Sequence, residues 1–423
     1  MANSFSKEER VAFEDILEGF QDLLVLSRHV NIYNTDQTMM ARTNDTIWRP
    51  QPYIAQSQNS TPGTPVTYQN MTQLSVPATL GFSQTVPWTM TTLDLRDALQ
   101  EGRLGESAKQ KLASDINVAI MNTAAAQGTL VVPVTTAAGD YDDVALCDTI
   151  MNEQGVPDYD RFLGLSSRDY NGLAGNLSQA SRSFGNAKSD RAYERSYVGM
   201  VAGFDTYKFD YANRIAVAAG GTTTIDTTGA QAQYVPQATS TAVGGQINVD
   251  NRYQTVVVNN TVGIVAGDCF TIDGIEAVHH ITKVSTGRLK TFRVISVTNS
   301  TTMVISPPII AATAPATDAE LQYKNVQLVA AASSAPINWL NTGASAINVF
   351  WQRDALEILP GRYAVPSDAG TAVMRATTDQ GVELVMQKFY DIDSMVIKYR
   401  LDTLFGVVNK QPEMSGVLLF NQP

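Results

Sequence analysis

The histidines and cysteines are the side chains of this 423-residue sequence that would most readily do chemistry, and they are few. His279 and His280 are adjacent, so on a strand they would point to opposite faces and could not easily share one metal ion. His29 stands alone. Cys147 and Cys269 form no C-x-x-C motif, and we expect two free thiols in a reducing compartment. Neither pair predicts a catalytic or metal site.

Two clusters of charge are the next candidates. Asp140, Asp142 and Asp143 lack the glycine and the distal glutamate of a calcium-binding EF-hand, so we predict a solvated acidic loop. A loose basic cluster is interrupted by Asp190 and Glu194, which favours an exposed or intersubunit face over a nucleic-acid site. The basic cluster consists of Arg182, Lys188, Arg191 and Arg195.

Sequence motifs for common enzyme chemistries are absent. The chain contains no phosphate-binding P-loop, no G-x-G-x-x-G, no G-x-S-x-G and no H-E-x-x-H. Its formal net charge of −11 opposes nucleic-acid binding through the overall field of the protein. No apolar run reaches the ~18 to 20 residues of a membrane span, and the acidic N-terminus does not resemble a signal peptide. We therefore predict no catalytic residue, no cofactor, no metal and no membrane partner, and we expect folding in a cytoplasm.

The first residues predict an amphipathic helix. Ser6 and Glu9 fit a capping box, and apolar side chains follow at helical spacing. The stripe must be buried, either on the chain's own domain or on a neighbouring subunit or assembly partner. The stripe consists of Phe13, Ile16, Leu17, Phe20 and Leu24.

Residues 50–80 predict an extended excursion from the fold. The stretch is rich in Pro, Gln, Ser, Thr and Asn and has few residues that could fill a core. Loops of this length without a core of their own are usually functional or disordered. A β-hairpin arm fits the alternation of residues such as Val66 and Tyr68, and a disordered linker is the alternative.

Residues 93–127 carry the longest helical pattern. Thr92 is a suitable N-cap and Gly128 a suitable C-cap, and the helix would span ~50 Å. Gly102 and Gly105 predict a kink or a break in the first third. Apolar residues recur every four positions at Leu112, Ile116, Ile120 and Ala124.

The remaining chain predicts a β domain inserted into an α/β layout. Residues 221–340 are rich in Gly, Thr, Val and Asn and show two-residue alternation between turn signals, which is typical of an antiparallel barrel or sandwich. Predicted strands there are 255–258, 269–272, 292–297 and 303–305. Before the insertion we predict a helical turn at 148–152, a strand and turn at 159–165 and a helix from 169 that ends near Gly175. After it we predict strands at 348–351, 355–359, 383–390, 395–401 and 416–420.

Five short stretches, in their order along the chain, carry a resemblance to a known family. They are NDTIWRP at 44–50, DLRD at 94–97, VAGFD at 201–205, NVDNRY at 248–253 and NVFW at 348–351. Together they cover most of the chain and are similar to the major capsid (coat) proteins of short-tailed enterobacterial phages. The resemblance implies an α+β fold of the Hong Kong ninety-seven type, shared with herpesvirus capsids. This fold has a long spine helix, β-sheets and an extended β-hairpin loop, and here it would carry an inserted antiparallel β-barrel.

The resemblance also implies an organisation and a function. The protein would form pentamers and hexamers of an icosahedral procapsid around a scaffolding protein, with a portal protein at one vertex. DNA packaging would drive expansion, and the virion would enclose double-stranded DNA without sequence-specific binding, after assembly in the host cytoplasm. The implied segments are an N-terminal arm (1–44), an extended loop (45–90), the spine helix of a peripheral domain (91–128), the first part of an axial domain (129–220), the inserted barrel (221–340) and the return to both domains (341–423).

Candidate assembly contacts follow from this picture. We expect the extended loop to lie over a neighbouring subunit, the barrel to stabilise the fold, and a loop before Asn248 to reach between capsomers. The family's reaching loop is expected to offer acidic residues for ion pairs, but residues 240–246 carry no charge, so hydrogen bonds would have to replace them. The candidate contacts are Phe13, Phe20, Trp48, Arg49, Tyr53, Tyr68, Asp250 and Arg252.

Two other functions remain open from the sequence. A tail-tube or fibre subunit would fit the β-rich middle, although fibres usually show repeats and none is found. A hydrolytic or carbohydrate-active enzyme with a β accessory domain could hide a carboxylate pair among scattered acidic residues.

Overall fold

The computed structural model divides the described part of the chain into two compact units. The first comprises Met1–Ile47, Ala78–Met121 and Leu356–Val408, and the second comprises Trp48–Pro77, Asn122–Ala355 and Asn409–Pro423. The structure describes residues 5, 7–33, 46–52, 55, 57, 60, 62–63, 65–66, 68, 70–91, 98–180, 187–209, 213–225, 233–313, 315–329, 334–365 and 371–421.

A long, mainly antiparallel sheet forms the first unit. Its order is β1-β19-β22-β21-β20, with β4 also paired to β22. β1 and β19 run parallel, whereas the pairs β20–β21, β21–β22 and β22–β4 are antiparallel. β19 is buried along its whole length, and β21 and β22 are buried over residues 383–386 and 401–406. Trp88 stacks on Tyr399 with 5.6 Å between ring centroids. The strands are β1 (Asn31–Ile32), β4 (Phe82–Thr91), β19 (Leu356–Pro360), β20 (Ala372–Thr377), β21 (Glu383–Asp391) and β22 (Val396–Asn409).

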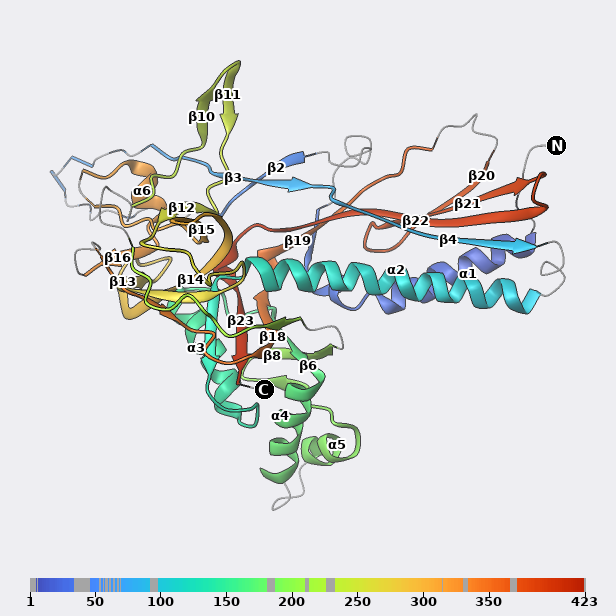
Figure 1. Ribbon diagram of the computed structural model, residues 1–423, viewed down its shortest axis with the longest axis horizontal. Helices are drawn as coiled ribbons and strands as arrows, with labels where there is room; N and C mark the ends of the chain where they lie inside the picture. The colour runs from blue at the N-terminus through green and yellow to red at the C-terminus, as the bar shows by residue number, and fades with distance from the viewer. Residues whose placement is uncertain are drawn as a thin grey trace. The chain divides into compact units, whose positions relative to one another are not determined.

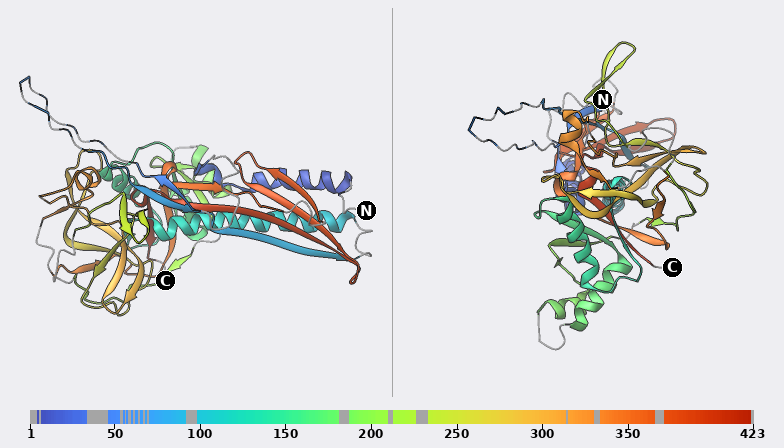
Figure 2. Two further views of the ribbon diagram at one scale, coloured as in Figure 1. Left: turned by 90° about the horizontal axis from the view of Figure 1, so that it is seen from above. Right: turned by 90° about the vertical axis from the view of Figure 1, so that its left-hand side faces the viewer.

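Two helices run along this sheet, as Figure 1 and the left view of Figure 2 show. The predicted N-terminal helix is confirmed as α1 (Lys7–Leu23), which a 3-10 turn, η1 (Leu26–His29), follows. Asn117 of α2 (Ala98–Gln127) accepts a hydrogen bond from the Leu26 amide and donates one to the Leu23 carbonyl, so α2 holds the end of α1.

The break predicted near Gly102 and Gly105 is wrong, because α2 is continuous across both glycines. Gly105 has a packing role instead. A Cβ at this position would lie 2.6 Å from the Cδ1 of Ile16, so a larger residue would force the Ile16 side chain to move. The predicted beginning of this helix, residues 93–97, lies outside the described residues.

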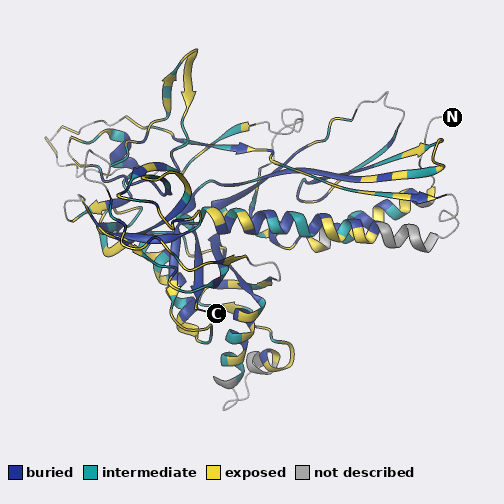
Figure 3. Ribbon diagram, viewed as in Figure 1, coloured by how far each residue is buried: buried dark blue, intermediate teal, exposed yellow. Residues whose placement is uncertain are grey.

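A mixed sheet with helices forms the first part of the second unit. Its order is β5-β23-β18-β6-β8-β7, with β9 also paired to β18. β18 and β23 are almost wholly buried and appear dark blue in Figure 3. The strands are β5 (Leu130–Val134), β6 (Arg161–Ser166), β7 (Met200–Val201), β8 (Phe204–Phe209), β9 (Arg214–Ile215), β18 (Ser345–Gln352) and β23 (Ser415–Phe420).

The helices of this part correct two predictions. α3 (Tyr141–Gln154) begins well before residue 148, because Asp140 and Asp143 form a reciprocal capping box at its N-terminus. The acidic cluster is therefore a helix cap and not a solvated loop. α4 (Ser167–Ala180) continues past Gly175, where the glycine faces open space and does not end the helix. A third helix, α5 (Ala187–Arg195), follows.

An antiparallel sheet forms the inserted part of the second unit, and its strands confirm the four predicted there. The order is β12-β15-β14-β13-β16, with β17 also paired to β13. Phe270 and Phe292 stack at 5.7 Å at the centre of its aliphatic core. The elements are β12 (Gln254–Val257), β13 (Cys269–Val278), β14 (Ser285–Asn299), β15 (Thr302–Ser306), α6 (Asp318–Tyr323), β16 (Val326–Leu328) and β17 (Ile337–Trp339).

Short elements complete the fold. β2 (Thr46–Pro50) pairs with β3 (Ser75–Thr79), and β10 (Thr239–Ala242) pairs with β11 (Gly245–Asn248). Two further 3-10 turns are η3 (Arg353–Ala355) and η4 (Pro412–Met414). The strands predicted after residue 340 are confirmed as β18, β19, β21, β22 and β23.

Candidate assembly surfaces

The extended loop begins and ends at a closed base. β2 and β3 pair there, and the Gln51 amide donates to the Leu74 carbonyl at 2.9 Å. Gln73 Nε2 donates to the Gln51 carbonyl at 2.7 Å, and Gln51 Nε2 donates to Oε1 of Gln411 at 3.0 Å. The chain between residues 51 and 74 therefore leaves and re-enters the unit at one fixed point.

Apolar side chains of this loop face solvent. Tyr68 is 95% exposed, and Val66 and Met71 are also exposed. Exposed aromatic side chains on an extended segment are typical of a surface that a partner covers. Of the other candidates, Trp48 and Arg49 are half-buried in β2, and Tyr53 lies outside the described residues.

Phe13 and Phe20 are placed differently from the expectation that they contact a neighbour. Their side chains are 5% and 0% exposed inside the chain's own first unit. Glu9 on the same helix accepts a hydrogen bond from Tyr399 Oη at 2.8 Å and pairs with Lys388. In this conformation the buried side chains of α1 support its own unit, whereas Val11 and acidic side chains such as Glu14 and Glu18 are exposed.

The loop before Asn248 is a β-hairpin of two short strands, β10 and β11, which stands out from the inserted sheet in Figure 1. Its strands are exposed or partly exposed, as Figure 3 shows, and Val243 at its turn is fully exposed. Asn251 fixes its base, because its amide group donates to the carbonyls of Gln237 and Val249 and accepts from the Gln237 amide. The hairpin is thus held firmly at its root and presents an uncharged tip.

Asp250 and Arg252 pair with each other within the chain. The guanidinium of Arg252 donates to both carboxylate oxygens of Asp250, at 2.7 Å from Nη2 and 2.9 Å from Nε. Arg252 Nη1 also donates to the Asn409 carbonyl at 2.9 Å, and the guanidinium lies 5.1 Å from the Tyr253 ring centroid. Only 6% of the Arg252 side chain is exposed. This pair therefore fastens the inserted sheet to the chain that leads into β23.

A row of buried polar side chains on β14, which we call the seam, joins the inserted sheet to the mixed sheet. Lys290 Nζ donates to Gln154 Oε1 at 2.8 Å and pairs with Glu413 at 2.5 Å. Thr291 Oγ1 donates to the Thr129 carbonyl at 2.8 Å. These bonds satisfy polar groups that the contact between the two sheets takes out of water.

Arg293 completes the seam at the C-terminal end of α2. Its Nη1 donates to the carbonyls of Ala125 and Gly128, and its Nη2 donates to the Gly267 carbonyl at 3.0 Å. Carbonyls at a helix C-terminus lack intrahelical partners and carry partial negative charge, so a buried cation suits them. Arg293 is 1% exposed.

Charges near the seam shift the pKa values of their neighbours. Burial lowers the pKa of His280 to about 4, although Glu413 favours its protonated form, and Lys283 and Lys290 lower it further. Burial likewise lowers the pKa of Lys283 to about 8. Burial alone would raise the pKa of Glu413, but attraction to Lys290, His280 and Lys283 outweighs it and the net shift is downward.

The His280 shift predicts a loss of stability in mild acid. The unfolded state binds the His280 proton near pH 6.5, and the folded state binds it only near pH 4. The free energy of unfolding is therefore highest above pH 6.5 and falls as the pH drops below that value. We expect the free energy of unfolding to fall by about 2 kcal/mol between pH 7.5 and 5 from this group. Urea titrations of the unassembled subunit at both pH values measure it. In the His280→Gln variant, most of the stability difference between the two pH values should disappear. An unchanged difference would show that His280 does not cause it.

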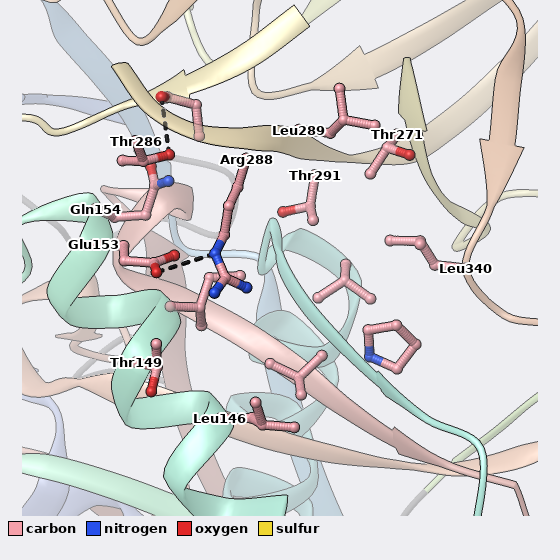
Figure 4. A pocket seen from close by; sticks show the side chains of 15 residues that line it. Leu146, Thr149, Glu153, Gln154, Thr271, Thr286, Arg288, Leu289, Thr291 and Leu340 are labelled. Carbon is pink, nitrogen blue, oxygen red and sulfur yellow. Dashed lines mark hydrogen bonds and ion pairs between the residues drawn. The ribbon is translucent and has the colours of Figure 1, made fainter. Parts of the chain in front are cut away.

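A pocket of about 490 Å³ lies beside the seam, between α3 and β5 on one side and β13 and β14 on the other (Figure 4). Arg288 reaches across it to Glu153, with 3.1 Å between Nε and Oε1. The rest of its lining is mainly aliphatic and threonine side chains. Among the described residues that line this pocket, Glu153 is the one carboxylate, and no cysteine or histidine is present.

The remaining sequence candidates carry no reactive chemistry. Cys147 and Cys269 are free and buried, and burial raises the pKa of both thiols. Within the described part of the chain, no three His, Cys, Asp or Glu side chains cluster as a metal site. Arg191 and Arg195 lie at an exposed surface hollow with Glu194 and Tyr197, while Arg182 lies outside the described residues. Of the helices in the described ranges, none is long and apolar enough to cross a membrane.

The most extensive polar contacts were missed by sequence reasoning. Asn251, Lys290, Arg293 and Glu413 were not singled out, because isolated polar residues within a β-rich stretch give no pattern. The stretch NVDNRY did mark the neighbourhood of Asn251, although only through family resemblance.

These features define an α+β protein with a long helix beside a long antiparallel sheet, a second antiparallel sheet and exposed projections. A model of the P22 coat protein family (gene protein 5) matches residues 1–421, so the chain belongs to this family. It is a phage major capsid protein, a structural protein and not an enzyme, and copies of it assemble into an icosahedral shell. The predicted family and α+β capsid fold are confirmed, and the tail, fibre and hydrolase alternatives are set aside.

Solved structures of phage capsids resemble the chain. A chain of Mycobacterium phage Che8 is 10% identical, with a TM-score of 0.46, over 93% of this chain and 90% of that one. The capsid of Cyanophage P-SCSP1u gives 9% identity and a TM-score of 0.45 over 93% and 87%. The CUS-3 coat protein I-domain is 34% identical over 28% of this chain and 96% of that one, with a TM-score of 0.22.

Proposed function

We propose that this capsid protein forms pentamers and hexamers of a procapsid built around an internal scaffolding protein, with the extended loop of each subunit lying over a neighbour. The observation that carries the proposal is the loop between Gln51 and Leu74, which is closed at its base and exposes Tyr68. The exposed apolar side chains of the loop gain stability when they are buried against another copy. Repetition of one modest contact around a shell then gives a stable assembly.

The uncharged hairpin supports contacts between capsomers. Its strands offer edge backbone groups and hydroxyl groups, and Val243 and Ile247 offer apolar surface. Such a contact would depend on hydrogen bonds and apolar burial, whereas an acidic loop would depend on ion pairs. Added salt would therefore weaken the contact little.

The other partners follow from the same scheme. A portal protein would occupy one vertex, and double-stranded DNA would fill the interior without sequence-specific contacts. The net charge of −11 supports this, because an acidic wall does not hold phosphates. Assembly would take place in the host cytoplasm, and packaging would drive expansion.

Electron microscopy of the protein expressed with and without its phage's scaffolding protein tests this function. We expect closed shells of uniform size with the scaffold, and free subunits or irregular shells without it. Closed uniform shells in equal yield without scaffold would refute the scaffolding step. Stable compact monomers in both samples would refute the assembly scheme as a whole.

A further inference from the structure

We propose that α6, the short helix between β15 and β16, is a clamp for residues 70–74, which form the returning limb of the extended loop. The clamp would set the direction in which the loop leaves the subunit. This inference rests on the proposed role of the loop as a contact to a neighbour. It gives the inserted sheet a second task beyond stability, which is to aim an assembly element.

Side chains of α6 bind the backbone of the limb at its first two anchor points. Asp318 Oδ2 accepts a hydrogen bond from the Asn70 amide at 2.9 Å. Gln322 Oε1 accepts from the Thr72 amide at 3.1 Å, while its Nε2 donates to the Asn70 carbonyl at 3.0 Å. One glutamine side chain thus bridges two limb residues as a neighbouring strand would.

Tyr323 provides the third anchor point. Its hydroxyl donates to the Thr72 carbonyl at 3.1 Å and accepts from the Leu74 amide at 3.3 Å. The anchored residues 70, 72 and 74 alternate, which is the period of an extended chain. The clamp therefore recognises the extended shape of the limb through its backbone.

Burial makes the clamp firm on one side of the limb. Gln322 and Tyr323 are buried, and Leu74 packs with Ile310 and Tyr323 in a small apolar cluster. α6 is itself fixed by a capping box in which Thr317 and Glu320 bond reciprocally. Because α6 is capped and its side chains are already buried, it can hold the limb backbone in one direction with little further loss of conformational entropy.

The other side of the limb is open. Asn70 and Met71 are exposed, so the clamp leaves their side chains available. Because every clamp bond ends on a limb backbone atom, we expect the side chain of Met71 to tolerate substitution, whereas Gln322 and Tyr323 should not.

Hydrogen–deuterium exchange of the unassembled subunit tests the clamp. Gln322→Ala removes two hydrogen bonds to the limb backbone, so we expect amides in peptides covering residues 70–74 to exchange about 10-fold to 30-fold faster. Tyr323→Phe removes only the hydroxyl and keeps the apolar packing, and it should speed the same peptides by several-fold. Gln327→Ala, an exposed glutamine on β16, is the matched control and should change them less than about twofold.

Two outcomes overturn the proposal. Wild-type exchange of residues 70–74 in both clamp variants would show that α6 does not hold the limb. Faster exchange together with wild-type shell yield would show that it holds the limb without aiming the loop. A chain whose loop is replaced tests the proposed function separately, so failure of the clamp and failure of the loop contact are distinguishable.

Discussion

A chain in which residues 55–68 are replaced by a Gly/Ser linker of equal length is expected to fold normally and to lose shell assembly. The replacement removes Val66 and Tyr68, which are exposed and contribute nothing to the core of the subunit. It stops short of Leu74, Val76 and Ala78, which are buried and would destabilise the subunit if they were deleted. Because a shell repeats each contact many times, we expect the shell yield to fall about 100-fold or more.

Sedimentation and electron microscopy with scaffold measure this yield, and thermal unfolding of the unassembled subunit provides the control. A melting temperature within a few degrees of the wild type shows that the loss arises from assembly. Tyr68→Ala alone should give an intermediate yield, since one aromatic side chain carries only part of the contact. Closed shells in normal amount from the linker chain would contradict the assignment of the loop.

Arg293→Leu is expected to cause the largest loss of stability. It would leave the carbonyls of Ala125, Gly128 and Gly267 buried without their shared cationic donor. Leucine would fill much of the space, but it cannot donate hydrogen bonds to those carbonyls. It also cannot balance the partial negative charge at the C-terminal end of α2. We expect the free energy of unfolding to fall by about 3 to 4 kcal/mol.

The matched control lies on the same strand. Arg288 is 67% exposed and pairs with Glu153, so Arg288→Ala should cost less than about 1 kcal/mol. Urea unfolding of both variants measures the difference. Equal losses in the two variants would show that the seam does not stabilise the subunit through Arg293.

Elements with a periodic apolar pattern were predictable from the sequence. The stripe containing Phe13 and Phe20 marks α1, and alternation marks β14 and β15, because each element must bury one face. The side on which α1 docks was left open, and the structure buries both phenylalanines in the chain's own unit. Periodicity states that a face is buried and does not state by which partner.

The seam and the helix boundaries were not predictable in this way. In a regular strand, Lys290 and Arg293 would lie on opposite faces, yet both are buried in the seam. The register of β14 against β13 shifts between Leu289 and Thr291, and alternation cannot anticipate such a shift. Asp140 was read as part of a loop because the helix that it caps has a weak apolar pattern.

The direct test of the account is a cryo-electron microscopy map of assembled shells in which residues 51–74 can be traced. The account predicts that Tyr68 contacts a neighbouring subunit while the backbone at residues 70–74 stays on α6 of its own subunit. A loop folded back over its own subunit throughout the shell, without contact to any other copy, would contradict it.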